Sequence, residues 1–333
     1  MAATNTEVSV NQEIALKKEV AGPVASVPVQ VGTHYFRQQY LFAFATQAEV
    51  LQYLRTQTLS EELARVPEIF SAWQEVQPRV ADRIGREAGI ADGIRVAEIP
   101  ADHQPKLDSF SADNLFQKTF SHLPVSFGLV EIDRLVAPQR TVNLDYVDRL
   151  VARYPKNPSL DQLLDICISP TREMEPIQHL EVAPNTHVFS SPNSDIRFLG
   201  AFVKELTTED MGHAVFGGLP AAAVIAFIGY GGAPINVLQW GGRVVLNNGF
   251  HRVYALRSMG VTDVPVVIQH VSNPQLEFPP QVAGLPKEYL LGVPRPVVMK
   301  DFFEDGFAIT LRVRDRLKMV TVGIALNQHD VPA

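Results

Sequence analysis

Alternating apolar and polar positions are clearest in the second half of the chain. Residues 234–240 alternate in the manner of a half-buried strand, and residues 243–246 form a second apolar strand. The two glycines between them, Gly241 and Gly242, are typical of a two-residue hairpin turn, because glycine adopts positive φ without steric cost. The pattern predicts an antiparallel strand–turn–strand unit.

A helix and a further strand are expected directly after this hairpin. Asn247, Asn248 and Gly249 lead into a helix predicted over 250–259, and Gly260 is placed to end it in a left-handed cap. Residues 264–268 read as the next strand, and Pro265 indicates that the strand begins there or lies at an edge.

Helical patterns dominate the predicted structure of residues 35–92. Thr46 and Ser60 are candidate helix caps, and Pro67 suits the first turn of a later helix. In that helix an apolar stripe recurs at three- and four-residue steps, while Pro78 is expected to kink or split it. The stripe consists of Ile69, Trp73, Val76 and Val80.

The other segments give weaker patterns. Residues 1–30 resemble a flexible arm, and 93–128 a surface connector that leads into a short strand at 128–132. Asn143 can cap a helix that ends at Tyr154-Pro155. Residues 157–218 are divided by prolines, which favours short strands and loops.

Three expectations concern the regions on either side of the hairpin. Residues 219–227 read as a buried helix that starts with Pro220. Residues 272–296 are rich in proline and predict an irregular wrap. Residues 308–313 and 319–325 have strand composition, and the charged run between them predicts a hairpin connection.

Composition narrows the class of protein. The 333 residues carry a net charge of −7, which disfavours nucleic acid as a partner unless the basic residues are gathered in a patch. Cys167 is the one cysteine, so no intramolecular disulfide forms, and we expect a buried thiol and a cytoplasmic location. No apolar run approaches the ~20 residues of a membrane span.

Candidate chemistry gathers at the start of the helix predicted over 250–259. Gly249 lets backbone N–H groups approach an anion, and the helix N-terminus adds unpaired donors and a positive dipole end. His251 and Arg252 lie in the first turn, where arginine offers a planar fork that matches phosphate oxygens. Asn247 and Asn248 can bond a ligand or cap the helix.

These residues resemble a known motif. The run from Gly249 to Ala255 is similar to the G-x-x-R-x-x-A box of the ParB/sulfiredoxin-like superfamily, and residues 231–237 are similar to its glycine-containing P-I-x-V segment. Gln139 and Arg140 are similar to its Q-x-R region. The resemblance implies that these elements converge on a nucleotide-phosphate pocket, and that a nucleotide with Mg²⁺ is the candidate cofactor.

The chain departs from two branches of that superfamily. Phe250 stands where sulfiredoxin has its catalytic cysteine, which disfavours reductase chemistry. A proline-rich stretch follows the box where partition proteins have a helix-turn-helix domain. The carboxylates Glu205, Glu209 and Asp210, with His213, form no compelling metal or general-base set.

The predicted fold class is α+β, with a ParB/sulfiredoxin-like mixed-sheet core, an N-terminal helical region and a proline-rich C-terminal wrap that ends in a β-hairpin. The expected division is an arm at 1–30, a helical region and connector at 35–124, the core at 125–270 with an insertion at about 151–218, and the wrap at 271–333.

Three functions remain open from the sequence. The first is binding of a nucleotide or another phosphate-bearing small molecule, with hydrolysis or phosphoryl transfer if the protein is an enzyme. The second is a non-enzymatic assembly protein that retains the fold and self-associates. The third is a DNA-associated regulator or nuclease, which requires a basic patch.

Overall fold

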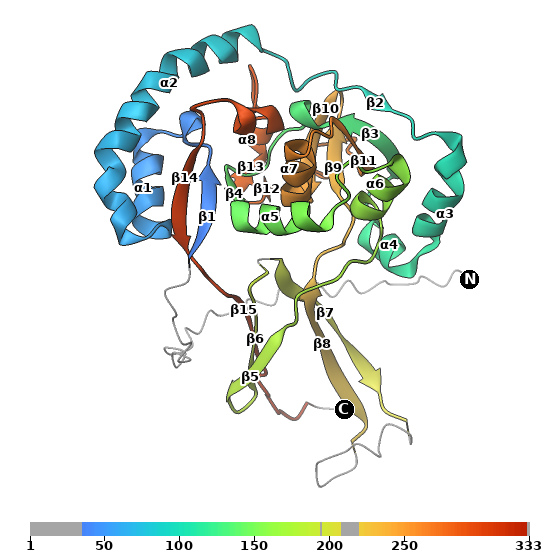
Figure 1. Ribbon diagram of the computed structural model, residues 1–333. Coiled ribbons are helices and arrows are strands. Elements are labelled where there is room, and N and C mark those ends of the chain that lie inside the picture. Colours follow the sequence, from blue (N-terminus) through green and yellow to red (C-terminus); the bar gives the residue numbers. More distant parts are fainter. Residues whose placement is uncertain (1–34, 194, 208–219, 332–333) are drawn as a thin grey trace, which may run out of the picture.

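The structure is a computed structural model that describes residues 35–193, 195–207 and 220–331. It is an α+β protein in which a body of sheets and helices carries β-ribbons that extend away from it (Figure 1). The predicted arm at 1–30 lies outside the described residues. Within the described residues, no helix is both long and apolar enough to cross a membrane.

A five-stranded mixed sheet forms the centre of the body, in the order β10-β9-β11-β3-β2. The hairpin turn at Gly241 and Gly242 is confirmed, because Trp240 pairs with Arg243 across it and Gly241 has a φ of +57°. β11 lies parallel to β9 and antiparallel to β3. The strands are β2 (Val96–Ala97), β3 (Val125–Glu131), β9 (Asn236–Trp240), β10 (Arg243–Asn248) and β11 (Asp263–His270).

Pro265 occupies a position that a strand interior tolerates. The pairing of β11 with β9 begins only at Val267, so the missing N–H of Pro265 leaves no gap in that ladder. On its other side Pro265 lies opposite Leu129 of β3. The expectation that the strand begins at Pro265 or lies at an edge is wrong, because β11 begins at Asp263 and lies between β9 and β3 in the sheet.

Three helices pack beside this sheet (Figure 1). α7 follows β10 and ends before Gly260, whose φ of +91° gives the predicted left-handed cap. Asn143 caps α5 by accepting a hydrogen bond from the N–H of Tyr146, as predicted. α6 was not predicted, although Ser159 and Gln162 form a capping box at its start. The helices are α5 (Leu144–Arg153), α6 (Leu160–Cys167) and α7 (Phe250–Ser258).

A second sheet, in the order β14-β1-β4, corrects two expectations. Residues 35–40 form a strand, β1, within the region predicted to be helical, because they pair with β14 from the far end of the chain. β14 and β15 do not form the predicted C-terminal hairpin, since β14 pairs with β1 and β15 with β6. The strands are β1 (Tyr35–Tyr40), β4 (Thr141–Asn143), β14 (Ile309–Arg314) and β15 (Lys318–Gly323).

Helices α1 (Gln47–Gln57) and α2 (Val66–Arg86) cover this second sheet on the outside (Figure 1). Thr46 caps α1 through a capping box, as predicted. Ser60 caps no helix, because it is the first residue of the 3-10 helix η2 (Ser60–Arg65) and its side chain makes no cap bond. α2 runs unbroken through Pro78, so the helix is not split there. The alternative expectation, a kink at Pro78, stays a prediction.

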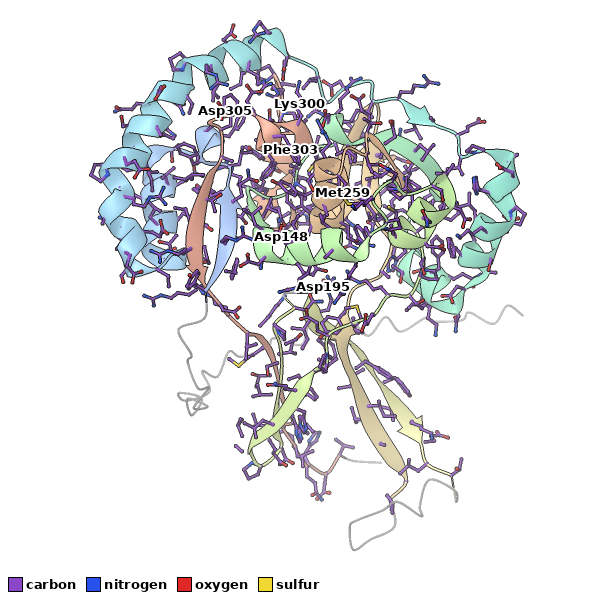
Figure 2. The ribbon with its side chains drawn as sticks, in the orientation of Figure 1. Asp148, Asp195, Met259, Lys300, Phe303 and Asp305 are labelled. Carbon is purple, nitrogen blue, oxygen red and sulfur yellow. The ribbon has the colours of Figure 1, made fainter. Side chains whose placement is uncertain are left out.

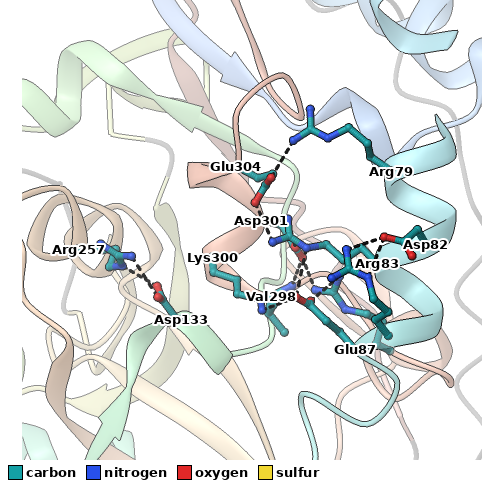
Figure 3. A network of polar contacts seen from close by, with 12 residues as sticks. Arg79, Asp82, Arg83, Glu87, Asp133, Arg257, Val298, Lys300, Asp301 and Glu304 are labelled. Atoms are coloured by element: carbon teal, nitrogen blue, oxygen red, sulfur yellow. Dashed lines mark hydrogen bonds and ion pairs between the residues drawn. The ribbon is translucent and has the colours of Figure 1, made fainter. Parts of the chain in front are cut away.

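An ion-pair network joins α2 to the 3-10 helix η6 (Met299–Phe303) (Figure 3). Arg83 contacts Glu304 at 2.7 Å, and Lys300 contacts Glu87 at 2.7 Å. These pairs connect residues more than 200 positions apart in the sequence, and they hold the C-terminal part of the chain against the N-terminal helix.

The segments predicted as connectors contain regular structure. Residues 93–124 include two helices, α3 (Gln104–Ala112) and α4 (Asn114–Thr119), the second of which is capped by Asp113. The proline-rich segment 272–296 is irregular, as expected, apart from a small two-stranded sheet and one helical turn. These are β12 (Gln281–Val282), β13 (Leu285–Pro286) and α8 (Lys287–Leu290).

The part of the chain between α6 and β9 in the sequence contributes two β-structures that project from the body (Figure 1). β5 (Gln178–Ala183) and β6 (Thr186–Ser191) form a sheet with β15. β7 (Ile196–Glu205) and β8 (Ala222–Tyr230) form a two-stranded ribbon. The buried helix predicted over 219–227 is therefore wrong in its described part, because continuous pairing with β7 makes this apolar run a strand.

The largest of three hydrophobic clusters among the described residues extends through the body. Its buried members come from both ends of the chain, from Leu41 to Phe307, and include the sheet residues Val237 and Val266. Cys167 is fully buried in this core, as predicted, and burial raises the pKa of its thiol to about 12. The core places the N-terminus of α7 at a fixed position beside the projecting ribbons.

Candidate functional site

The turn from β10 into α7 requires glycine at position 249. Gly249 has a φ of +94°, which L-amino acids with a side chain rarely adopt. A Cβ atom at this position would also come within 2.6 Å of Cγ1 of Ile235. No side chain caps the helix start, so the first N–H groups of α7 lack a cap partner. The turn therefore presents backbone donors and the positive end of a nine-residue helix.

A cavity of about 630 Å³ opens at this helix terminus, where the ribbons meet the body. Figure 2 shows Asp195, one of its lining residues, at that junction. The lining comes mainly from β1, α5, β10 and α7, from the loop before β4, from the segments around β7 and from the C-terminal end of β14. Six of the seven predicted site residues line it, namely Gln139, Asn247, Asn248, Gly249, His251 and Arg252.

Arg252 is buried at the cavity and has unusual partners. One Nη donates to the backbone oxygen of Ile166 at 3.1 Å, and the other to that of Ala233 at 2.5 Å. Among the described residues no carboxylate forms an ion pair with it, and its buried Nε has no hydrogen-bond partner. Burial, and then the nearby charge of Arg172, lower the pKa of Arg252. The guanidinium thus carries a positive charge that no described acidic side chain neutralises.

His251 is neutral in this environment. Burial lowers the pKa of its imidazole to about 4, well below the ordinary value of 6.5. The backbone N–H of Asn143 donates to its Nε2 at 3.1 Å, so the proton of the neutral ring resides on Nδ1. His251 therefore adds no positive charge to the site: its Nε2 accepts from the N–H of Asn143, and its Nδ1–H is a hydrogen-bond donor.

The two asparagines bind protein groups. Asn248 donates from Nδ2 to the backbone oxygens of Gly232 and Pro234, at 2.8 and 2.9 Å. Asn247 donates to Oδ1 of Asn236 at 2.8 Å. Both side chains therefore hold the 232–236 segment against the start of α7, which fixes the shape of this wall of the cavity.

Of Gln139 and Arg140, only Gln139 lines the cavity. Gln139 donates to the backbone oxygen of Thr141 at 2.6 Å. Arg140 lies outside the lining, where it contacts Glu49 at 3.1 Å and lies over the ring of Tyr289. The structure thus brings together every predicted site residue except Arg140.

Five arginines that sequence reasoning missed also line the cavity, in addition to Arg252. Although the whole chain is acidic, six arginines and three carboxylates line the cavity. Arg172 is the most confined of the missed arginines, since it has a buried Nε without a partner and contacts Asp195 at 3.6 Å. The arginines are Arg149, Arg172, Arg197, Arg252, Arg314 and Arg316, and the carboxylates are Glu175, Asp195 and Asp315.

No signal along the sequence marks these arginines as a group. They come from α5, from the loop after α6, from β7 and from the end of β14, and only the fold brings them to one cavity. A search for clusters of basic residues along the chain cannot detect such a set.

Metal chemistry has little support from side-chain clustering. The described residues contain no group of three or more His, Cys, Asp or Glu side chains arranged to hold a metal ion. Glu205 is exposed at the end of β7, away from the cavity lining. Glu209, Asp210 and His213 lie outside the described residues.

Comparisons with known proteins give no further guide to the site: no protein-family model, no curated protein and no solved structure matches this chain.

Proposed function

We propose that this protein binds a phosphate-bearing small molecule, most suitably a nucleotide, in the cavity at the N-terminus of α7. The observation that carries the proposal is the buried, carboxylate-free guanidinium of Arg252 in the cavity wall. A buried charge is costly unless it is paired. An anion in the cavity would supply the missing counter-charge.

The surrounding groups suit phosphate in particular. The uncapped N-terminus of α7 offers backbone N–H donors, which bind phosphate oxygens at many helix termini. Arg172 contacts Asp195 through one Nη, and its buried Nε has no protein hydrogen-bond partner, so Nε can donate to a ligand. Arginine matches the paired oxygens of a phosphate better than lysine does. A volume of about 630 Å³ is in the range of cofactor and small-ligand sites.

The resemblance of the Gly249–Ala255 box to the ParB/sulfiredoxin-like superfamily supports a nucleotide as the ligand. In that reading the ParB-like fold is the glycine turn, α7 and the mixed sheet that positions them. If Mg²⁺ accompanies the nucleotide, Glu175 is the best-placed carboxylate, because it lines the cavity and no protein partner of its side chain is found among the described residues. Any hydrolysis would then rest on positioning and charge stabilisation.

A thermal-shift panel tests the proposal. The purified protein is heated with CTP, ATP, ADP, GTP or inorganic phosphate, each with and without magnesium. A ligand present at 100 times its Kd adds about 2.7 kcal/mol of apparent stability, so binding gives a clear upward shift in Tm. Arg252→Ala and Arg172→Gln are measured beside the wild type.

The variants separate binding from folding. Arg172 is partly exposed and makes one contact, so Arg172→Gln is expected to fold normally and to lose most of the ligand-induced shift. Arg55→Gln on α1 is the matched control, because Arg55 is not among the lining residues although Gln57 of the same helix is, and this variant should keep the full shift. The absence of a shift with every compound in the wild type would refute the proposal.

A further inference from the structure

The β7–β8 ribbon carries large apolar side chains into solvent. It extends away from the body (Figure 1), and its two described strands pair with no described strand outside the ribbon. Six side chains on it are each at least 47% exposed, which is unusual for so short a segment. They are Phe198, Leu199, Phe202, Val203, Val224 and Phe227.

Both faces of the ribbon are apolar. Phe202 pairs with Ile225, and the next residues along, Val203 and Val224, pair with each other. Because successive residues of a strand point to opposite faces, the first pair lies on one face and the second on the other. Phe202 also stacks on Phe227, with ring centroids 5.5 Å apart. Packing of the ribbon onto the body would bury only one of these faces.

The edges of the ribbon are unpaired as well. Its sheet contains only β7 and β8 among the described strands, so the outer N–H and C=O groups of both strands have no ladder partner. An isolated two-stranded ribbon is marginally stable in water, and a third strand or a packed face is needed to secure it. Free, apolar edges of this kind also pair readily with another strand.

We propose that the ribbon is a self-association surface, which pairs with the ribbon of a second copy of this chain. Three half-exposed phenylalanines and three exposed aliphatic side chains amount to on the order of 600 Å² per copy, close to the roughly 800 Å² per partner of a standard interface. Two ribbons related by a two-fold axis cover each other's apolar faces and join their free edges in one self-complementary contact.

The charges on the ribbon favour this partner over an anionic one. The described residues of β7 and β8 carry three charged side chains, Arg197, Lys204 and Glu205. Arg197 is bound to Asp195 at the base of the ribbon. The described strands of the ribbon therefore present no cationic border that would attract nucleic acid or an acidic lipid surface. The inference does not depend on ligand binding in the cavity.

Light scattering after size exclusion gives the first test on the full chain. The wild type is expected to elute as a dimer or a larger closed assembly. Val224→Glu and Phe202→Glu place charges on opposite faces, and each is expected to shift the particle to the monomer mass while the Tm of the body is retained. Leu276→Glu is the matched control, because Leu276 is exposed at 83% but lies in a loop away from the ribbon.

Cysteine cross-linking gives the second test. Since Cys167 is buried, Val224→Cys supplies the one accessible thiol, and mild oxidation should yield a covalent dimer that Leu276→Cys does not form at the same protein concentration. A wild-type monomer up to the solubility limit would overturn the proposal. Retention on vesicles of neutral phosphatidylcholine that Val224→Glu abolishes, with the protein monomeric in solution, would assign the ribbon to a lipid surface and would equally overturn it.

Discussion

The backbone N–H of Asn143 donates to Nε2 of His251 across 3.1 Å, which ties the N-terminus of α5 to that of α7. The two helices are far apart in sequence and meet at the cavity. The bond requires a neutral imidazole, because a protonated ring has no lone pair to accept it. The protonation state of one histidine thus controls a contact between two helix termini.

Stability should therefore fall as the solution is acidified through the range of this histidine. The folded pKa of about 4 lies below the ordinary value of 6.5, so the unfolded chain binds the proton more readily between these values. The contribution is fully present above pH 6.5 and is lost as the pH falls toward 4, with an upper bound of about 3 kcal/mol. Urea unfolding of the wild type and His251→Gln across this range measures it. Identical pH profiles for the two proteins would contradict the assignment.

Gly249→Ala should lower the free energy of unfolding more than Gly260→Ala does. Both glycines have a φ above +90°, so both replacements carry backbone strain of about 1–3 kcal/mol. Only at Gly249 does the new Cβ also meet Ile235, whereas nothing lies within 4 Å at Gly260. Denaturant unfolding of the two variants gives the comparison. Equal losses of unfolding free energy in the two variants would show that Ile235 moves aside without measurable cost.

The ion pair between Arg295 and Asp301 should be strongly coupled to folding. The two side chains are fully buried and lie 2.6 Å apart, in the network that connects η6 to α2 (Figure 3). Arg295→Met leaves the carboxylate buried without this partner, so we expect a loss of about 3–5 kcal/mol in chemical denaturation. Asp82→Asn in the exposed Asp82–Arg86 pair is the control, and it should change stability little. A small loss in Arg295→Met would mean that water reaches the network.

Cys167 should be unreactive in the folded protein. Its thiol is fully buried, and its pKa of about 12 leaves almost no thiolate at neutral pH. A thiol reagent such as Ellman's reagent is expected to modify it only in denaturant. Rapid labelling under native conditions would show that the α6 region opens.

Sequence patterns predicted those parts of the fold that depend on contacts between residues close together in the chain. Gly241 and Gly242, the Asn143 cap and the limits of α7 depend on contacts within a few positions, and they are confirmed. β1 was missed because its partner β14 lies at the other end of the chain. β8 was mistaken for a helix because an unbroken apolar run has no period that distinguishes the two.

The candidate site likewise has a part that the sequence predicted and a part that it did not. Gly249, His251 and Arg252 are consecutive or nearly so, and a single motif gathers them. Arg172 and Arg197 reach the cavity through a loop and a projecting ribbon, which no local pattern places. Sequence reasoning also could not show that Arg252 is engaged by two backbone carbonyls and lacks an acidic partner among the described residues, since this follows from the packing of α7 against α6 and against the segment before β9.

We propose that the uncompensated arginine charge in the cavity binds a phosphate group. The most direct test is isothermal titration calorimetry of the wild type, Arg172→Gln and Arg55→Gln with pyrophosphate and with the nucleotide that shifts Tm most. We predict saturable binding to the wild type, at least about tenfold weaker binding to Arg172→Gln, which is 1.4 kcal/mol, and no change in Arg55→Gln. The same affinity in all three proteins, or no binding to the wild type, would contradict the account.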